Sequence, residues 1–241
     1  MTYLSVIIPA YKSAAVLKNN VPYLINYLKS KNYDFEIIIV DDGSEDNGQT
    51  KQVAEEFGCI FLSNEKNAGK GESVRKGMLH AKGSFRIFTD ADIPFDAEAI
   101  EQFLYYLDEK EFHLAIGDRT LNESSYFNSK SGLRNVASKA FSFVVGRFIA
   151  GGMFDTQCGI KGFRAEVAKD LFSVSRIKGF TFDVELLYIA LKRNYDIKRL
   201  PVTLRSQEGQ SVKLLLHSFT MMGDLLKIKL NHVTKKYNKL A

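Results

Sequence analysis

Cysteine is scarce in this chain of 241 residues, which contains only Cys59 and Cys158. The two lie far apart and match no paired spacing of a zinc or redox motif, so we expect free thiols in a reducing compartment. Long apolar runs are absent too, since none approaches the ~20 residues that cross a bilayer as a helix. The opening residues, MTYLSVIIPAY, lack the basic start of a signal peptide. These absences predict a cytoplasmic protein that is not integral to a membrane.

The chain also has no internal repeat, low-complexity tract or linker rich in proline, glycine and serine. With 45% hydrophobic and 25% charged residues, it can build one large α/β domain with its own core. We expect this domain at residues 1–204, followed by a basic amphipathic helix at residues 205–241.

The formal net charge of +5 is concentrated in residues 205–241, which hold seven basic and two acidic side chains. A basic segment indicates a polyanionic partner: nucleic acid, phosphate-bearing lipid or an anionic membrane surface. The lysines alternate with Leu and Met rather than with solvent-facing aromatic residues, which argues against nucleic acid. A solvated surface helix would have the same charge pattern.

Short apolar runs alternate with helical patterns along the first half of the chain. The predicted strands are 4–8, 36–40, 59–62, 84–89 and 113–116. Helical patterns lie between them, ending near 31 and covering 46–57, 71–81 and 97–110. This alternation predicts an α/β fold with a mostly parallel, Rossmann-like sheet that has helices on both faces. Such sheets bind ligands at the carboxyl ends of their strands.

The second half is less regular. A polar loop is expected at 118–132, an apolar helix at 136–150, a helix at 181–193, a strand at 197–204 and a long helix at 212–230. The last helix is apolar almost all round, which is typical of a core helix or of one that lies in a membrane interface.

Two acidic clusters follow predicted strands. Asp41 and Asp42 come after the second strand, and Asp90 and Asp92 after the fourth. Because strand side chains alternate, Asp-x-Asp places both carboxylates on one face, which suits Mg²⁺ or Mn²⁺ shared with substrate phosphates. Each cluster alone could equally be a turn, since Asp and Gly are ordinary turn residues.

A glycine-bearing loop, Asn67–Gly71, precedes the third helical pattern. Its spacing is not that of a P-loop. Its lysine, Lys70, and its backbone N–H groups are nevertheless placed to meet a phosphate.

The segments SVIIPAY, IIIVDDGS, NAGKGESVRKG and TDAD, in this order, resemble family-2 glycosyltransferases, which have the type-A glycosyltransferase fold. Three further segments, DTQCGIKGF, FTFDVELLYIA and LPVTLRSQEGQS, resemble the dolichyl-phosphate β-glucosyltransferase group. Polyprenyl-phosphate mannose synthases share much of this pattern, but some have Gln two residues after the second Asp, where this chain has Pro94. That departure favours the glucose group.

The resemblance implies a role for individual residues. Nucleotide-sugar binding would fall to Pro9, Ala10, Tyr11, Asp41, Asp42, Lys70, Arg75, Asp90 and Ala91. Metal binding would fall to Asp90 and Asp92, and the catalytic set would be Asp90, Asp92 and Arg119. The acceptor phosphate would meet Arg134, Arg205 and Lys213. Residues 1–118 would form the nucleotide-sugar half of the catalytic domain and residues 119–204 the acceptor half.

The activity that the resemblance implies is inverting transfer of glucose from UDP-glucose to a polyprenyl phosphate, with Mg²⁺ or Mn²⁺ as cofactor. The protein would be peripheral on the cytoplasmic face of a membrane, with the helices at 136–150 and 212–230 at the interface. A phosphate acceptor is already ionised near neutral pH and needs no general base.

Other functions remain open from the sequence. A soluble enzyme that acts on a glycan hydroxyl would need a general base, for which Asp183 and Glu185 are candidates. Both are equally consistent with structural caps or salt bridges. Further alternatives are a GDP-mannose-using enzyme and a non-catalytic nucleotide-sugar-binding adaptor.

Overall fold

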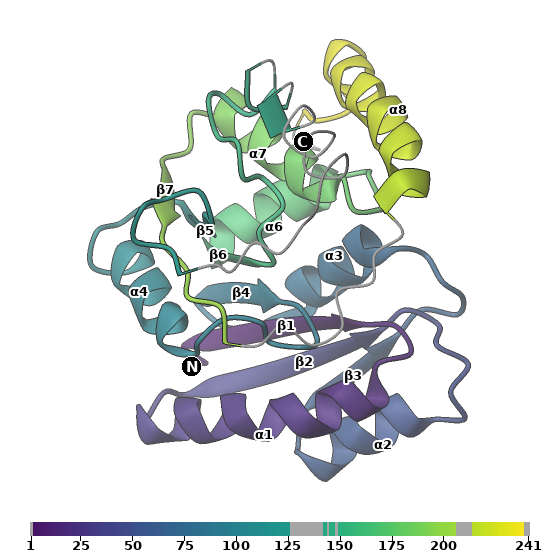
Figure 1. The fold of residues 1–241 in the computed structure, drawn as a ribbon, viewed down its shortest axis with the longest axis vertical. Helices are drawn as coiled ribbons and strands as arrows, with labels where there is room; N and C mark the ends of the chain where they lie inside the picture. The colour runs from purple at the N-terminus through teal and green to yellow at the C-terminus, as the bar shows by residue number, and fades with distance from the viewer. Residues whose placement is uncertain (1, 126–141, 144, 148, 206–213, 239–241) are drawn as a thin grey trace.

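The protein is described here by a computed structural model that covers residues 2–125, 142–143, 145–147, 149–205 and 214–238 (Figure 1). Its centre is one twisted sheet, seven-stranded in the described part of the chain, in the order β3-β2-β1-β4-β6-β5-β7. The strands are β1 (Leu4–Ala10), β2 (Phe35–Asp41), β3 (Ile60–Ser63), β4 (Phe85–Thr89), β5 (Leu114–Gly117), β6 (Ile160–Arg164) and β7 (Ile197–Leu200). Only β6 is antiparallel to its neighbours among these strands.

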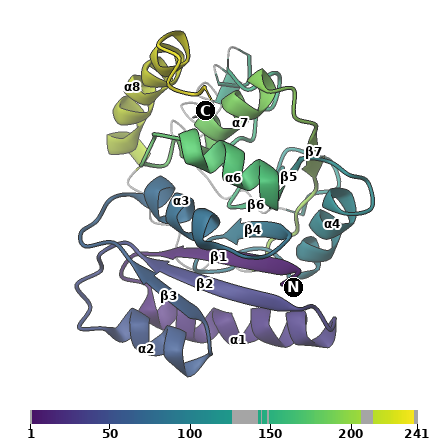
Figure 2. The same ribbon diagram turned by 180° about the vertical axis from the view of Figure 1, so that it is seen from behind.

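Helices cover both faces of the sheet, as Figures 1 and 2 show from opposite sides. They are α1 (Ala14–Ser30), α2 (Gln49–Glu56), α3 (Lys70–His80), α4 (Glu98–Leu107), α6 (Ala165–Val174), α7 (Phe182–Lys192) and α8 (Leu214–Val233). Alternate residues of β1 enter different clusters: Val6 and Ile8 pack with α1, α2 and α4, whereas Ile7 packs with α3, α6 and α7. The period of two along the strand therefore divides the core into two layers.

The predicted alternation of strands and helices in the first half is confirmed, with boundaries shifted by a few residues. The strand predicted at 197–204 is too long, because β7 ends at Leu200. The next residue is Pro201, which has no N–H to donate to the sheet. In the helix predicted at 136–150, residues 142–143 and 145–147 are helical, and 136–141, 144 and 148 lie outside the described residues.

Strand β6 and helix α6 were not predicted. The sequence of β6, IKGFR, has a lysine and a glycine where a central strand usually has apolar side chains. Lys161 is nevertheless fully buried, and its ammonium lies 2.7 Å from a carboxylate oxygen of Asp183 and 2.9 Å from the carbonyl oxygen of Cys158. A buried ion pair thus takes the place of an apolar contact in β6. The sequence of this strand therefore lacks the apolar pattern by which a buried strand is predicted.

Helix α8 packs on the rest of the molecule by one face. Leu225 and Ile228 are buried in the same core cluster as Tyr188 of α7 and Tyr237, which follows α8. Among the described residues, none of the helices combines the length and the apolar character needed to cross a bilayer.

The buried pair of Lys161 and Asp183 leads to a stability prediction. Lys161→Met should lower the free energy of unfolding by about 3–5 kcal/mol, because it leaves the buried Asp183 carboxylate without its cation. Urea unfolding would measure this loss. The exposed Lys169→Met on α6 should change stability by no more than about 0.5 kcal/mol.

Combining Lys161→Met with Asp183→Leu should recover much of the loss, because the uncompensated charge is then removed. A double variant that is as unstable as the single Lys161→Met variant would contradict the assigned ion pair.

Candidate functional site

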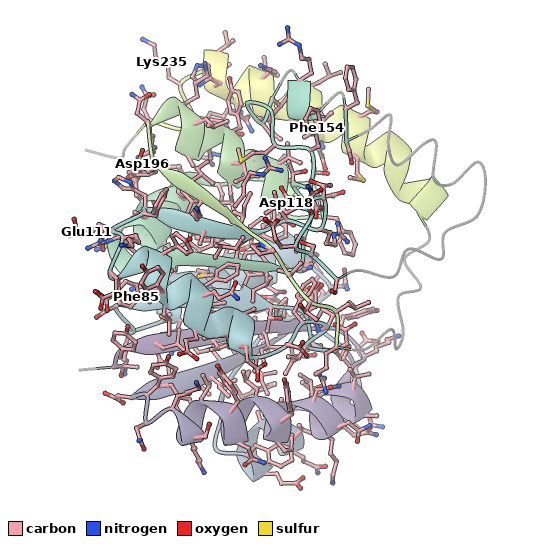
Figure 3. The ribbon with its side chains drawn as sticks, turned by 60° about the vertical axis from the view of Figure 1, so that its left-hand side comes forward. Phe85, Glu111, Asp118, Phe154, Asp196 and Lys235 are labelled. Atoms are coloured by element: carbon pink, nitrogen blue, oxygen red, sulfur yellow. The ribbon has the colours of Figure 1, made fainter. Side chains whose placement is uncertain are left out.

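The carboxyl ends of β1, β2 and β4 meet at one edge of the sheet. Ala10 at the end of β1 pairs with Asp41 at the end of β2, and β4 ends at Thr89 beside them. Because β6 is antiparallel, its first residue, Ile160, pairs with Thr89, so the preceding segment 155–159 reaches the same edge. Figure 3 shows Asp118 and Phe154 on one side of the molecule, and Phe85, at the start of β4, on the other.

Asp90 and Asp92 lie at this edge beside Lys70, the first residue of α3. The Lys70 ammonium forms an ion pair with Asp90 Oδ1. Burial opposes the charge on Lys70, but the carboxylates of Asp90, Asp183 and Asp92 outweigh it and raise the lysine pKa. Burial, helped by repulsion from Asp90, raises the pKa of Asp92 to about 6. The neighbouring cations therefore stabilise the ionised Asp92 carboxylate less than burial and Asp90 destabilise it.

Gly159, from the DTQCG segment, makes room for the Asp90 carboxylate. A Cβ atom built at Gly159 would overlap Asp90 Oδ2. Lys161 lies two residues further along, and its pair with Asp183 contributes to the same local field, since Asp183 is coupled electrostatically to both Lys70 and Asp90. Three carboxylates and two ammonium groups are thus gathered here, and the Arg205 guanidinium also acts on Asp92.

Asp42 organises the loop that carries Lys70. Its carboxylate accepts hydrogen bonds from the Asn64 side chain at 2.8 Å and from the backbone N–H groups of Ala68 and Gly69, both at 2.9 Å. Most of its acceptor capacity is therefore used within the chain. Its predicted contact with the nucleotide would have to use the lone pairs of the Asp42 carboxylate that accept none of these three hydrogen bonds.

The loop amides are also occupied at the start of α3. The N–H groups of Gly71 and Glu72 both donate to the carbonyl oxygen of Lys178, at 2.7 and 3.3 Å. These two N–H groups, like those of Ala68 and Gly69, therefore already have acceptors within the chain. What the loop presents to the site is the Lys70 ammonium.

Tyr11 and Asp41 flank the end of β1. Tyr11 is 45% exposed, and the Lys12 ammonium lies 5.3 Å from the centre of its ring. Asp41 accepts hydrogen bonds from the backbone N–H and the hydroxyl of Ser44, so it shapes its own turn and keeps free lone pairs. Pro9 and Ala10, the two residues of β1 that precede Tyr11, are buried.

Arg205 supports the loop that contains Asp92. Its guanidinium donates to the carbonyl oxygens of Ile93 and Asp92, both at 3.3 Å, and lies 4.3 Å from the centre of the Tyr23 ring. Ile93 has φ of 42°, a left-handed conformation that is strained for a β-branched residue. Arg205, predicted to bind an acceptor phosphate, is therefore also the residue that holds this strained turn. Ala91, between the two carboxylates, is half-buried against the core.

Arg119 is held by Asp155. Its Nε and one terminal nitrogen donate to the two carboxylate oxygens at 2.9 and 2.7 Å, and its backbone N–H donates at 2.7 Å. Although burial of Asp155 opposes its charge, these contacts lower its pKa. Asp155 is a site residue that the sequence analysis did not single out, although DTQCG was among the segments that carried the resemblance.

The remaining predicted cations fall elsewhere. Arg75 donates to the carbonyl oxygen of Phe172 in α6 at 2.9 Å and pairs with Glu72, so it contributes to helix packing. Arg134 and Lys213 lie outside the described residues.

Both candidates for a general base are buried and engaged. Asp183 is paired with Lys161, and Glu185 accepts hydrogen bonds from the backbone N–H groups of Arg176 and Ile177 and from the Tyr237 hydroxyl. The thiol of Cys158 is buried as well, which raises its pKa to about 12 and makes it unreactive.

The donor set for a metal consists of two carboxylates. No cluster of three or more His, Cys, Asp or Glu side chains with metal-binding geometry occurs in the described part of the chain. Asp90 and Asp92 alone fit a cation such as Mg²⁺, which takes one or two carboxylates and completes its shell with water and substrate phosphates.

Known proteins with similar sequences share one family. A family model described as Glycosyl transferase family 2 matches residues 5–172. The dolichyl-phosphate beta-glucosyltransferase of Dictyostelium discoideum is 31% identical over 247 residues, which cover 96% of this chain and 75% of that protein. The protein of the same name from Homo sapiens is 32% identical over 249 residues, with coverage of 96% and 76%.

Two solved structures have a similar fold. Glucosyl-3-phosphoglycerate synthase from Mycobacterium tuberculosis, in complex with Mg²⁺ and UDP, superimposes with a TM-score of 0.70 at 20% identity, over 94% of this chain and 79% of that one. For mannosyl-3-phosphoglycerate synthase from Rubrobacter xylanophilus the TM-score is 0.73 at 16% identity, with coverage of 100% and 77%. These likenesses confirm the predicted type-A glycosyltransferase fold.

The raised pKa of Asp92 leads to a prediction for the metal-free protein. The folded protein keeps the Asp92 proton up to about pH 6, whereas the unfolded chain loses it near the ordinary aspartate pKa of 3.8. The stabilisation from this proton is complete below pH 3.8 and is lost as the pH rises through 6. In a chelator at pH 7.5, Asp92→Asn should therefore be more stable than wild type by about 1 kcal/mol, allowing for partial exposure.

The stability gain should shrink toward zero near pH 4, where Asp92 is protonated, and thermal melts across this range would measure it. Mn²⁺ at pH 7.5 should then raise the melting temperature of wild type but not of Asp92→Asn. Exposed Glu65→Gln is the control: its stability should match that of wild type, and Mn²⁺ should raise its melting temperature as much as that of wild type. Equal stabilisation of Asp92→Asn by Mn²⁺ would rule out Asp92 as a ligand.

Proposed function

The chain belongs to glycosyl transferase family 2 and is a hexosyltransferase, and we propose that it transfers glucose from UDP-glucose to a polyprenyl phosphate at a membrane surface. The observation that carries the proposal is the cluster of Lys70, Asp90 and Asp92, at the sheet edge that also holds Tyr11 and Asp41. The similarity to dolichyl-phosphate beta-glucosyltransferases over most of the chain supports the acceptor.

The donor would lie across the ends of β1, β2 and β4. The exposed Tyr11 ring offers a stacking surface for uracil, and the free lone pairs of Asp41 can accept a hydrogen bond from the base or ribose. The diphosphate would then reach Lys70, whose ammonium can exchange part of its contact with Asp90 for a phosphate oxygen. Arg75 is left out of this proposed site, because its guanidinium is used by α6.

Asp90 and Asp92 would hold Mg²⁺ or Mn²⁺. When bound, the cation neutralises negative charge that develops on the departing diphosphate. Arg205 holds the backbone of Asp92, and Lys70 holds the Asp90 side chain.

The proposed reaction is a direct displacement. A phosphate oxygen of the acceptor forms a bond to the anomeric carbon while the bond from that carbon to the β-phosphate oxygen breaks, and UDP departs with the electron pair. The configuration inverts, and no proton has to move, because the acceptor phosphate is already ionised near neutral pH. Arg119, oriented by its two-point contact with Asp155, would help to balance the negative charge of two approaching phosphates.

The engagement of both possible bases favours a phosphate acceptor over a glycan hydroxyl. Asp183 is tied to Lys161, and Glu185 is fully buried among three donors. A hydroxyl acceptor would require one of them to give up those contacts in order to take a proton.

Exposed apolar side chains support a lipid acceptor and a peripheral membrane location. Phe143 and Phe154 stack near the Asp155 segment, although 58% and 40% exposed respectively. Helix α8 exposes an apolar stripe on one face, made of Met222, Leu226, Leu230 and Val233. Lysines flank this stripe, which is the pattern of helices that lie in a membrane interface. The free thiols of Cys59 and Cys158 agree with the cytoplasmic face.

The decisive experiment incubates the protein with labelled UDP-glucose, GDP-mannose or another UDP-sugar, with and without polyprenyl phosphate and with Mg²⁺, Mn²⁺ or chelator. We expect label in the organic phase only with UDP-glucose, lipid phosphate and metal, and none with Asp92→Asn. Transfer to a soluble glycan without lipid would favour the hydroxyl-acceptor alternative, and donor binding without any turnover would favour an adaptor.

The close contact of Gly159 with Asp90 predicts a specific loss of activity. Gly159→Ala forces the Asp90 carboxylate to move, which costs little folding free energy because the carboxylate is the far end of a side chain that can rotate while Lys70 follows it. A displacement of about 1 Å at a catalytic group costs on the order of 100-fold in turnover. We expect that loss with a nearly unchanged melting temperature. Gly179→Ala is the control, since a Cβ there meets nothing within 4 Å.

A further inference from the structure

Glu185 is a fully buried carboxylate that the proposed reaction does not use. One of its oxygens accepts hydrogen bonds from the backbone N–H groups of Arg176 and Ile177, at 2.9 and 2.8 Å. The other accepts a hydrogen bond from the Tyr237 hydroxyl at 2.7 Å. A charge at this depth is tolerated only because donors surround it. Glu185 therefore ties α7 to two segments at once.

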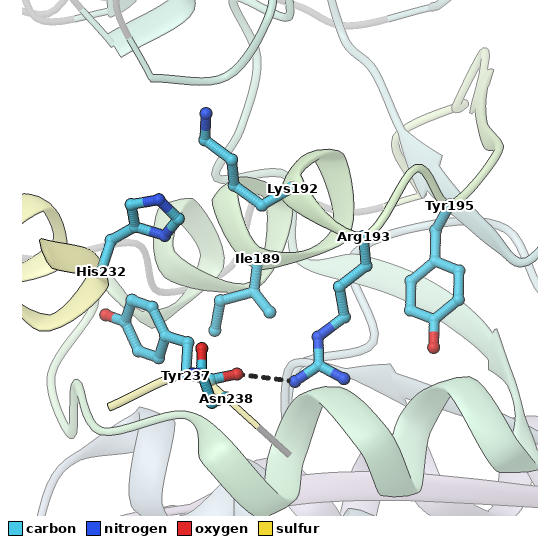
Figure 4. A pocket seen from close by; sticks show the side chains of 7 residues that line it. All are labelled: Ile189, Lys192, Arg193, Tyr195, His232, Tyr237 and Asn238. Carbon is cyan, nitrogen blue, oxygen red and sulfur yellow. Dashed lines mark hydrogen bonds between the residues drawn. The ribbon is translucent and has the colours of Figure 1, made fainter. Parts of the chain in front are cut away.

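Tyr237 belongs to the segment that follows α8 and folds back on the body of the protein. It is 7% exposed, its hydroxyl also receives a hydrogen bond from Asn231 at 3.3 Å, and its carbonyl oxygen accepts one from Arg193 at 2.8 Å (Figure 4). It lines a cavity of about 490 Å³ that Tyr195 also lines. The phenol thus anchors the end of the C-terminal helix beside Glu185.

The segment that Glu185 holds is in turn packed on the loop that carries Lys70. Lys178, next to Ile177, accepts the hydrogen bonds from Gly71 and Glu72 described above. The fit is close: a Cβ at Gly71 would lie 2.6 Å from the carbonyl oxygen of Ile177, and one at Gly69 would lie 2.5 Å from that of Lys178. Any shift of residues 176–178 must therefore move the start of α3.

We propose that Glu185 and Tyr237 are positioning residues for the donor site. Tyr237 fixes the Glu185 carboxylate, Glu185 fixes residues 176–178, and the Lys178 carbonyl fixes the N-terminus of α3 so that Lys70 meets Asp90. The C-terminal segment after α8 is thereby connected to the catalytic edge by a continuous series of hydrogen bonds. The consequence for catalysis rests on the proposed function, whereas the positioning itself does not.

The test compares two tyrosines that each donate one hydrogen bond to a carboxylate at the same cavity. Tyr237→Phe removes the bond to Glu185, and Tyr195→Phe removes a 2.8 Å bond to Asp170, whose ion-pair partner is Arg193. Hydrogen exchange of the Gly71 and Glu72 amides is measured relative to β1 amides, which report global unfolding. Exchange should accelerate about fivefold in Tyr237→Phe, the change that loss of one buried hydrogen bond gives, and not in Tyr195→Phe.

A second pair of variants separates the carboxylate's acceptor role from its bulk. Glu185→Gln keeps an oxygen for the amides of Arg176 and Ile177, whereas Glu185→Leu keeps only the volume. The Gln variant should retain exchange protection and most of the glucosyl transfer, and the Leu variant should lose both.

In Tyr237→Phe, kcat with UDP-glucose should fall about fivefold while Tyr195→Phe stays near wild type.

The outcomes test the positioning role of Glu185 and Tyr237 separately from the proposed glucosyl transfer. Unchanged exchange at Gly71 and Glu72 in Tyr237→Phe, or equal acceleration in Tyr195→Phe, would overturn the positioning role whatever the activities. A wild-type protein that is inactive with every sugar donor would sink the proposed function, while the exchange data would still decide the positioning.

Discussion

Strand β6 enters the sheet between β4 and β5 in the opposite direction to both, so that its first residue, Ile160, pairs with the last residue of β4, Thr89. This pairing brings the segment 155–159 to the edge where Asp90 and Asp92 emerge. Gly159 is then close enough to shape the position of Asp90, and Asp155 is placed to hold Arg119. A parallel strand at the same place would have carried these residues to the other end of the sheet.

The site is governed by a balance of charge in a poorly solvated place. Lys161 and Lys70 compensate part of the negative charge of three carboxylates, and burial raises the pKa of two of them, Asp183 and Asp92, that of Asp92 to about 6. A divalent cation, or the ammonium of a neighbouring lysine, stabilises the ionised form of a carboxylate whose pKa burial has raised. The strained turn at Ile93, supported by Arg205, holds the Asp92 carboxylate in this environment when no ligand is bound.

The loop that carries Lys70 shows how much of an active site is structural support. Asp42 takes the amides of Ala68 and Gly69, and Lys178 takes those of Gly71 and Glu72. These backbone donors are thus spent on holding the loop rather than on binding a phosphate. The support continues through Glu185 to Tyr237, so the end of the chain helps to define the geometry of its beginning.

The sequence by itself determined the local elements and the class of fold. Short runs of apolar residues identified the strands that lead to Asp41 and Asp90, because a strand covered on both faces needs apolar side chains on both. It did not identify β6, because Lys161 and Gly162 interrupt the apolar pattern and the compensating charge, Asp183, lies on a different element.

The partners of charged side chains were decided only by the tertiary structure. Arg75 and Arg119 look alike in the sequence, yet one packs against α6 and the other is fixed by Asp155 at the sheet edge that holds Asp90 and Asp92. Asp183 and Glu185, two residues apart, are held by a lysine from β6 and a tyrosine from the end of the chain. Local pattern reports which residues are buried, but the distance between charges, which sets their interaction, exists only once the chain has folded.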